Sequence, residues 1–346
     1  MKRTIILLVV FLLLGGGAFW YLNSEDERNK TTLAGADRDF AVKDIDRVHK
    51  IFIAGRNGER TTLRRDGQGG WTVNEAGKAN PNVVGPLLEA IKNVRVQYKP
   101  SDNAVDQMVK TLATQGLKVE LYDKQDEEIK TYYIGGSTAD ERGTYIILEG
   151  AEQPYVAEIP GFSGNISVRF ARTGDEWRDK TLFSKEVEDI QYLSVEYPKQ
   201  KNHSFVIEAS GGGYTVSPFY DITPEINRPF RDGSIEAYLV GYESVGAEAF
   251  RNEYATRDSV LQTIPFCRIT LVGQAQDTTS AVFYPIMEEK TISQDPKSGT
   301  YVSTGGYIDR YFVGYNRQDF MLAQHLVLED LFWAYGSFYE DSKMLN

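Results

Sequence analysis

Gly143-Thr144-Tyr145-Ile146 is the stretch that decides the fold, because its pattern returns further on as Gly299-Thr300-Tyr301-Val302. At the same spacing, and without a gap, three more pairs match: Gly150 with Gly306, Tyr155 with Tyr311 and Trp177 with Trp333. Self-similarity at a fixed spacing is the signature of a repeated structural unit. The sequence therefore predicts that one domain occurs twice.

Two further matches extend the repeat towards the N-terminus. Trp71-Thr72-Val73, after two glycines, returns as Tyr214-Thr215-Val216, again after glycines. The segment 117–122 alternates apolar and polar residues with period two, and so does its counterpart 267–272. Such alternation is typical of a strand with one buried face, and Gly211-Gly212-Gly213 before a strand indicates a hairpin turn.

Helical spacing appears in three places. Pro81 is followed by apolar residues at helical intervals, and proline is well tolerated in the first turn of a helix. A second helix is predicted over residues 105–114 and a third over residues 319–335. The predicted fold class is α+β: two tandem homologous repeats, 40–186 and 187–346, each a mainly antiparallel curved sheet with helices on one face.

The N-terminus predicts membrane targeting. Lys2 and Arg3 precede an uncharged apolar run from Ile5 to Leu22, which as a helix is just long enough to cross a bilayer core. An uncleaved anchor over residues 1–22 is favoured over a cleaved signal peptide, because the aromatic residues near its end suit a membrane interface. Residues 23–39 are expected to be a flexible tether. We therefore expect a single-pass protein of the bacterial inner membrane, with most of the chain in the periplasm.

Composition excludes some functions. The 38 basic and 49 acidic residues give a formal charge of −11, which repels phosphate backbones, so no nucleic-acid partner is expected. Acidic membranes are disfavoured in the same way, which leaves the N-terminal helix as the only expected membrane contact. The single cysteine, Cys267, lies in an apolar run and is interpreted as a small buried hydrophobe.

No chemical motif predicts catalysis. The chain has three histidines and one cysteine, without the spacing that a structural or catalytic metal site requires. No phosphate-binding loop or nucleophile elbow occurs, and the acidic run 123–128 is interpreted as a solvated turn. No catalytic, cofactor-binding or metal-binding residue is predicted, and cofactors are expected to be none. A pair of carboxylates for hydrolysis stays open, because so many acidic residues are present.

The densest polar and aromatic cluster spans residues 176–180. Trp177, Arg178, Asp179 and Lys180 are candidates either for ligand binding or for the junction between repeats. Because Trp177 recurs as Trp333 without the following charged residues, a structural role for the indole is favoured. Tyr214 and Tyr220 are further candidates for a binding surface made of aromatic side chains.

These residues also carry a resemblance to a known family. Tyr132-Tyr133-Ile134-Gly135-Gly136, the segments 154–156 and 159–162, Trp177 to Lys180 and Ser204-Phe205 resemble the Bacteroidetes branch of the family "domain of unknown function 4340". The resemblance implies an N-terminal membrane segment and repeated α+β units. It also implies, from some relatives, an auxiliary part in ABC-type systems of the gliding-motility kind, and it carries over no catalytic residue.

The expected function is a non-catalytic, membrane-anchored periplasmic scaffold or accessory subunit of a cell-envelope assembly. Its partners would be membrane proteins of that assembly, and its oligomeric state is not predicted. A periplasmic module that binds glycans or peptides is the alternative, and an envelope hydrolase comes third.

Overall fold

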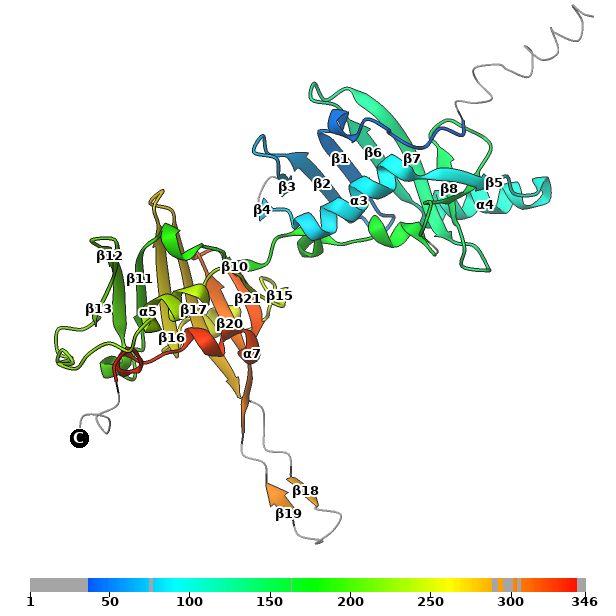
Figure 1. The fold of residues 1–346 in the computed structure, drawn as a ribbon. Helices are drawn as coiled ribbons and strands as arrows, with labels where there is room; N and C mark the ends of the chain where they lie inside the picture. Colours follow the sequence, from blue (N-terminus) through cyan, green and yellow to red (C-terminus); the bar gives the residue numbers. More distant parts are fainter. Residues whose placement is uncertain are drawn as a thin grey trace, which may run out of the picture. The chain divides into compact units, whose positions relative to one another are not determined.

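The computed structural model describes most of the chain, namely residues 37–74, 77–162, 164–287, 292–294, 301–303 and 306–340. They form two compact units, which divide between Asp179 and Lys180 (Figure 1). Both units consist mainly of antiparallel strands with few helices. Within the described residues, no helix is long and apolar enough to cross a membrane. The predicted anchor, residues 1–22, lies outside them.

The first unit contains a nine-stranded sheet in the order β4-β3-β2-β1-β6-β7-β8-β9-β5. Its strands are β1 (Lys50–Ala54), β2 (Arg60–Arg65), β3 (Trp71–Val73), β4 (Gly77–Lys78), β5 (Arg95–Tyr98), β6 (Leu117–Tyr122), β7 (Glu128–Ser137), β8 (Thr144–Leu148) and β9 (Tyr155–Glu158). The α-helices are α3 (Pro81–Asn93) and α4 (Asp102–Gln115), and the 3-10 helices are η1 (Ile45–Arg47), η2 (Ile166–Arg169) and η3 (Gly174–Trp177).

Helix α3 crosses one face of this sheet and closes its core (Figure 1). The Asn80 side chain caps the helix by accepting a hydrogen bond from Asn82 N at 2.9 Å, and Pro81 occupies the first turn, as predicted. The buried residues Val84, Leu87, Ala90 and Ile91 form the face that packs on the sheet. The predicted helix over 105–114 is also confirmed, as the larger part of α4.

The second unit contains an eight-stranded sheet in the order β13-β12-β11-β16-β17-β20-β21-β15. These strands are β11 (Ile190–Glu196), β12 (Phe205–Ser210), β13 (Gly213–Pro218), β15 (Ala249–Phe250), β16 (Cys267–Gly273), β17 (Thr278–Met287), β20 (Ile308–Tyr315) and β21 (Asp319–Gln324). Outside this sheet, β10 (Thr181–Phe183) pairs with β14 (Val245–Gly246), and β18 (Ile292–Gln294) pairs with β19 (Tyr301–Ser303). The helices are α5 (Ser234–Val240), α6 (Arg257–Leu261), α7 (His325–Leu328), η4 (Val187–Asp189), η5 (Lys201–His203), η6 (Glu329–Leu331) and η7 (Tyr335–Phe338).

Alternation along the strands separates a core face from an outer face in this sheet. Cys267, Ile269 and Leu271 are fully buried in the core, while Arg268 and Thr270 between them point to the other side. The hairpin between β12 and β13 turns at Gly211 and Gly212, whose φ angles of 59° and 88° favour glycine. The predicted hairpin turn and the predicted strand at 267–272 are thus confirmed.

The strands of the two sheets follow one another along the same path. In both units three N-terminal strands form a meander, which β4 extends in the first unit, and a helix follows. The sheet then continues through four strands to a short edge strand, β5 or β15, which in sequence lies between that helix and the four strands. Residue by residue, however, the gapless match that starts at Gly143 is wrong. Tyr155 lies on β9, whereas Tyr311 lies on β20, the strand whose place in the order corresponds to β8. The strands β18 and β19 lie between β17 and β20, where the first unit has a short turn, so any alignment of the two units needs a gap.

The predicted helix over residues 319–335 is wrong in its first part. Residues Asp319–Gln324 form β21, which pairs with β20 on one side and β15 on the other. Phe320, Met321, Leu322 and Ala323 are all buried. A strand covered on both faces shows a continuous apolar run, which periodicity cannot distinguish from a buried helix.

Candidate functional site

Trp177 lies at the end of η3 in the core of the first unit. Its relative exposure is 0%, and its Nε1 donates a hydrogen bond to the carbonyl oxygen of Arg172 at 3.1 Å. The turn that carries it is fixed by Thr173, whose N–H donates to the Glu176 carboxylate at 2.8 Å. Both faces of the indole are therefore covered by protein, and the side chain offers no platform for stacking a ligand.

The residues after Trp177 tie this end of the first unit to the segment before α3. Trp177 O accepts from Asn80 N, and Asp179 N donates to Lys78 O, both at 2.8 Å. Arg178 Nη1 lies 3.1 Å from an Asp175 carboxylate oxygen, and Lys78 Nζ lies 3.8 Å from Asp179. Arg178 and Asp179 thus take part in the structural contacts that close the unit.

Lys180 and Tyr214 belong to the second unit and bond mainly to its backbone. Lys180 Nζ donates to Glu248 O at 2.9 Å. The Tyr214 hydroxyl donates to Val187 O and to Ile190 O, the latter at 3.2 Å. Both side chains hold loops of the second unit in place.

Tyr220 differs from the other candidate residues because its hydrogen-bond partner lines a concave surface. Its hydroxyl donates to the Glu196 carboxylate at 2.5 Å, and the other Glu196 oxygen accepts from Arg268 Nη1 at 3.0 Å. Partial burial and the hydrogen bond to Glu196 raise the pKa of Tyr220 to about 12, so the phenol stays protonated at neutral pH. Glu196 and Arg268 are two of the residues that line the concave surface.

The sheet hollow, as we name it, is a cavity of 340 Å³ on the outer face of the second sheet. It is lined by Ser194, Glu196, Phe219, Leu261, Arg268, Thr270, Ser280, Val282, Tyr284, Gly314 and Arg317. Ser194, Thr270 and Ser280 stand directly opposite one another on β11, β16 and β17. Side chains opposite one another on neighbouring strands share a face, so three hydroxyl groups form a row across the floor.

Helix α6 forms one wall of the sheet hollow. The Tyr284 hydroxyl donates to Leu261 O at 3.3 Å. A Cβ atom at Gly314 would lie 3.2 Å from Leu261 Cδ2, so the glycine lets the helix approach the strand. Phe219, directly after β13, lines the cavity together with Leu261, and its ring meets that of Tyr220 edge-on. The hollow thus combines a hydroxyl floor with apolar walls.

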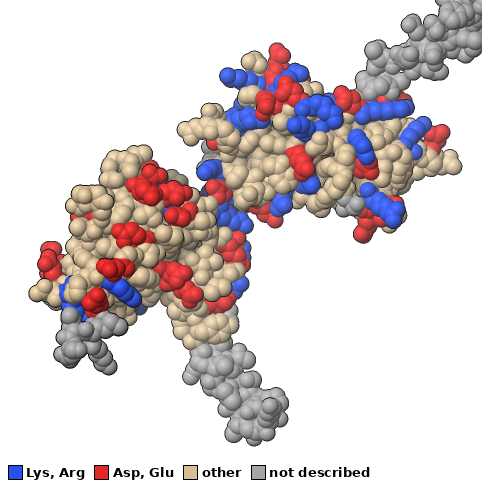
Figure 2. Space-filling model, in the orientation of Figure 1, with Lys and Arg blue, Asp and Glu red and all other residues tan. Residues whose placement is uncertain are grey.

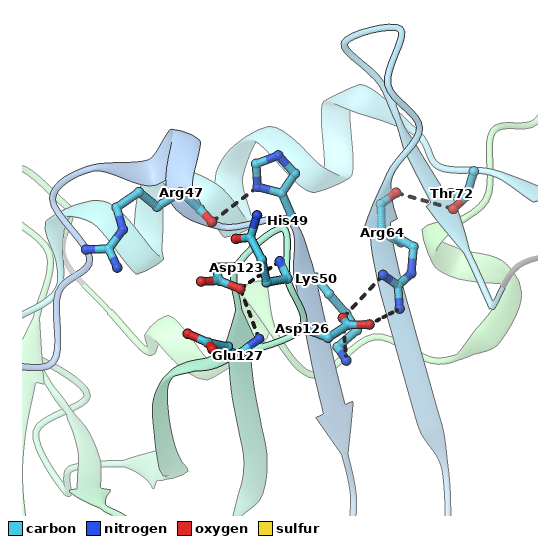
Figure 3. A network of polar contacts seen from close by, with 9 residues as sticks. Arg47, His49, Lys50, Arg64, Thr72, Asp123, Asp126 and Glu127 are labelled. Atoms are coloured by element: carbon cyan, nitrogen blue, oxygen red, sulfur yellow. Dashed lines mark hydrogen bonds and ion pairs between the residues drawn. The ribbon is translucent and has the colours of Figure 1, made fainter.

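A second polar cluster lies in the first unit, where the turn between β6 and β7 meets β1 and β2 (Figure 3). Asp126 is bound by Lys50 at 2.8 Å and by Arg64 at 3.3 Å. These two cations lower the pKa of the Asp126 carboxyl, Lys50 contributing first. Asp123 accepts from Glu127 N at 2.9 Å, as in the turn that the acidic sequence predicted.

A neighbouring cavity of 390 Å³ is lined by His49, Arg64, Arg65, Gly67, Gly69 and Lys124. Arg65 Nε donates to Val48 O at 2.9 Å, and its guanidinium lies 5.0 Å from the centre of the Trp71 ring. Because Arg64 and Arg65 already hold loops and strands together, this cluster is better explained by structure than by ligand binding.

Catalytic groups can be judged within the described ranges. No group of three or more His, Cys, Asp or Glu is placed there to hold a metal ion. Cys267 is fully buried and free, and burial raises the pKa of its thiol, so it is not poised as a nucleophile. Its interpretation as a small buried hydrophobe is confirmed.

The sequence singled out Tyr220 but missed the hydroxyl row, Arg317 and α6. The only signal available was the outward position of Thr270 in the alternating segment 267–272. Placing Ser194 and Ser280 beside it requires the strand register, which the sequence pattern alone does not contain.

Comparison with known proteins gives one result. Residues 71–261 match the model of a family described as "Domain of unknown function (DUF4340)". That range covers more than half of the chain and includes parts of both units. No curated protein and no solved structure matches the chain significantly.

Proposed function

The chain belongs to the DUF4340 family, and on this premise we propose that it is a non-catalytic accessory subunit or scaffold of a cell-envelope assembly. In this proposal the apolar segment from Ile5 to Leu22 anchors it in the inner membrane of a bacterium of the Bacteroidetes branch. The folded units stand in the periplasm and bind membrane proteins, an ABC-type transport system being the partner that the family resemblance suggests.

We also propose that the two units arose by duplication. The shared path of the strands supports this, and so does a matching set of backbone contacts. Asn80 N donates to Trp177 O in the first unit, as Arg231 N donates to Phe338 O in the second. Asp179 N donates to Lys78 O, as Glu340 N donates to Pro229 O. In this alignment the counterpart of Trp177 is Phe338, which is equally buried.

The observation that carries the accessory role is the free edge of β13, the outermost strand on one side of the second sheet (Figure 1). Phe219 N donates to Ser204 O across the hairpin. Because backbone groups alternate in direction along a strand, the N–H groups of Tyr214 and Val216 point away from β12. No backbone or side-chain partner for these two N–H groups is found among the described residues.

Within the described part of the chain, this edge lacks the usual protection against pairing. The strand is six residues long and carries no charge, although Pro218 ends it. In the first unit, by contrast, β3 is covered by β4, which is two residues long and ends in Lys78. Short strands, charges and covering elements are the means by which proteins block edge pairing. An open, uncharged edge therefore fits an extended segment of a partner protein that adds a strand.

The proposal can be tested by introducing positive charges that prevent a partner strand from pairing with β13. The double variant Thr215→Lys/Ser217→Lys places two cations on exposed positions of β13. The matched control Glu208→Lys changes the net charge by the same amount at the exposed residue opposite Thr215, on the interior strand β12. Full-length protein is crosslinked in intact cells and purified from solubilised membranes, and attached proteins are identified by mass spectrometry.

We expect the unmodified chain and the control to recover the same membrane proteins, and the double variant to lose about nine-tenths of them, corresponding to about 1.4 kcal/mol of binding energy. Recovery of the monomer alone from the unmodified chain would refute the accessory role. Equal recovery by the double variant would show that partners bind elsewhere than β13.

The second candidate function is a periplasmic binding module. The sheet hollow favours it, because a cavity with a few convergent polar groups and apolar walls is typical of small-molecule sites. The burial of Trp177 argues against the version of this candidate that uses its indole.

A further inference from the structure

The hydroxyl row of the sheet hollow makes no hydrogen bond within the part of the chain that the structure describes. No hydrogen bond of the Ser194, Thr270 or Ser280 hydroxyl to another described residue is found, although these side chains occupy three adjacent strands. Ser194 is only 6% exposed, so its hydroxyl lies low in the floor. Polar groups that converge in a cavity without partners in the protein are available to a ligand.

Arg317 supplies a cation at the side of this row. It follows Asn316 in the turn between β20 and β21, and Asn316 accepts a hydrogen bond from Ser280 N at 2.8 Å, which places the turn beside the floor. The φ angles of Asn316 and Arg317 are 47° and 60°, which identifies a hairpin turn whose second residue is usually glycine. An arginine there is conformationally costly, and no ion pair of its guanidinium with a described residue is found.

The charged residues that line the sheet hollow favour a ligand with a single negative charge. Its lining contains two cations, Arg268 and Arg317, and one anion, Glu196, so one positive charge is in excess. Arg268 is already paired with Glu196, which leaves the excess charge on Arg317. The fixed Glu196 carboxylate repels a dianion such as phosphate more strongly than a carboxylate. This local excess contrasts with the face of the second unit shown in Figure 2, where acidic side chains are more numerous than basic ones.

The size of the hollow limits the ligand. Its 340 Å³ lies near the lower end of the range of about 300 to 1,000 Å³ for small-molecule sites. The cavity therefore suits one small molecule, or the last residue of a longer one. Leu261, Val282 and Phe219 provide apolar surface beside the polar floor.

We propose that the sheet hollow binds a small monocarboxylate. Arg317 holds the carboxylate, the row of Ser194, Thr270 and Ser280 binds the polar groups next to it, and Phe219 and Leu261 contact an apolar part. The carboxylate can come from the C-terminus of a peptide or from an acidic sugar. This inference rests on the second candidate function, the binding module, and is independent of the free edge of β13.

Calorimetric titration of the solubilised full-length protein tests the proposal with two probes, N-acetylvaline and glucuronate. Their neutral counterparts, N-acetylvaline amide and glucose, serve as controls. The variant Arg317→Asn removes the cation and suits the turn, since asparagine tolerates its backbone conformation, and Arg317→Lys keeps a charge. Arg251→Asn is the matched control, because Arg251 is exposed and does not line the hollow.

We expect at least one of the two carboxylates to bind and neither neutral compound to do so. Binding of N-acetylvaline assigns the site to peptide termini, and binding of glucuronate assigns it to acidic sugars. Arg317→Asn should weaken binding about tenfold or more, because charge-assisted hydrogen bonds are the strong ones. Arg317→Lys should restore part of the affinity, and Arg251→Asn should leave it within about twofold.

The proposal is overturned if neither carboxylate binds, if the neutral compounds bind equally well, or if Arg317→Asn retains full affinity. A thermal midpoint of Arg317→Asn at or above that of the unmodified chain excludes misfolding as the cause of a loss. Since β13 is unchanged in this variant, retained membrane partners with lost carboxylate binding separate this inference from the accessory role.

Discussion

Replacing Trp177 by alanine should destabilise the first unit severely, because the indole is part of its core. The side chain is fully buried, and a buried aromatic side chain removes about 150 to 250 Å² from water. At about 25 cal/mol per Å² this corresponds to roughly 4 to 6 kcal/mol. Large-to-small substitutions at such positions cost about 3 to 5 kcal/mol, and we expect the Trp177→Ala variant to fall in this range.

The matched variant is Phe338→Ala, which removes the buried aromatic residue at the corresponding backbone position of the second unit. Amide hydrogen exchange followed by mass spectrometry reports on the units separately, since each peptide belongs to one of them. Trp177→Ala should raise exchange in peptides from α3 and β1, and Phe338→Ala should raise it in peptides from α5 and β12.

Two outcomes would contradict this reasoning. A loss of less than about 1 kcal/mol for Trp177→Ala would mean that the indole does not fill the core, since even the removal of one buried methylene costs about 0.5 to 1.5 kcal/mol. Loss of a ligand by a Trp177→Phe variant that keeps its stability would restore the candidate role of Trp177 in binding.

Two further predictions concern the first unit. The pKa of the Asp126 carboxyl is lowered, chiefly by its hydrogen bond to Lys50. Its ion pairs therefore stabilise the folded state fully above the pKa of the unfolded chain, about 3.9. This stabilisation is lost as the pH falls through the pKa of the folded state. Urea unfolding should therefore show that Asp126→Asn is less stable than the unmodified chain at pH 7 and that the difference shrinks below pH 4; a constant difference would refute the linkage. Gly143→Ala should cost about 1 to 3 kcal/mol, as overpacking does, because the new Cβ would lie 2.3 Å from Val156 Cγ1. An unchanged unfolding midpoint would contradict this close approach of Gly143 to Val156 on β9.

The sequence predicts elements well where one face of a strand or helix is buried. The alternation in 117–122 and 267–272 and the spacing after Pro81 both report a single buried face, and both predictions are confirmed. Prediction fails at β21, where neighbours cover both faces and the periodic signal disappears. It fails again for the gapless match from Gly143, since identical residues at a constant spacing do not show whether a hairpin has been inserted between them.

The candidate site was harder to predict from the sequence than the fold. Tyr220 was recognisable as an aromatic residue outside a regular element, but its partner Glu196 is 24 residues away in sequence. The three hydroxyls come from three strands, and a shift of one residue in register would turn any of them into the core. Such a row becomes visible only when the pairing of β11, β16 and β17 is known.

The same register shows how the corresponding place in the first unit differs in its side chains. The row that corresponds to Ser194, Thr270 and Ser280 consists in the first sheet of Phe52, Glu120 and Thr131, opposite one another on β1, β6 and β7. There Glu120 accepts hydrogen bonds from both Lys118 and the Tyr122 hydroxyl, and a phenylalanine fills the place of a serine.

In the first sheet this row therefore contains a paired carboxylate and a phenylalanine beside the buried Thr131, while in the described part of the second sheet it consists of three hydroxyls with a cation at its side. If the two sheets descend from one, their cores were kept and their outer faces diverged. Recognition by this protein should accordingly depend on outward-facing residues of the second unit, at the free edge of β13 and in the sheet hollow.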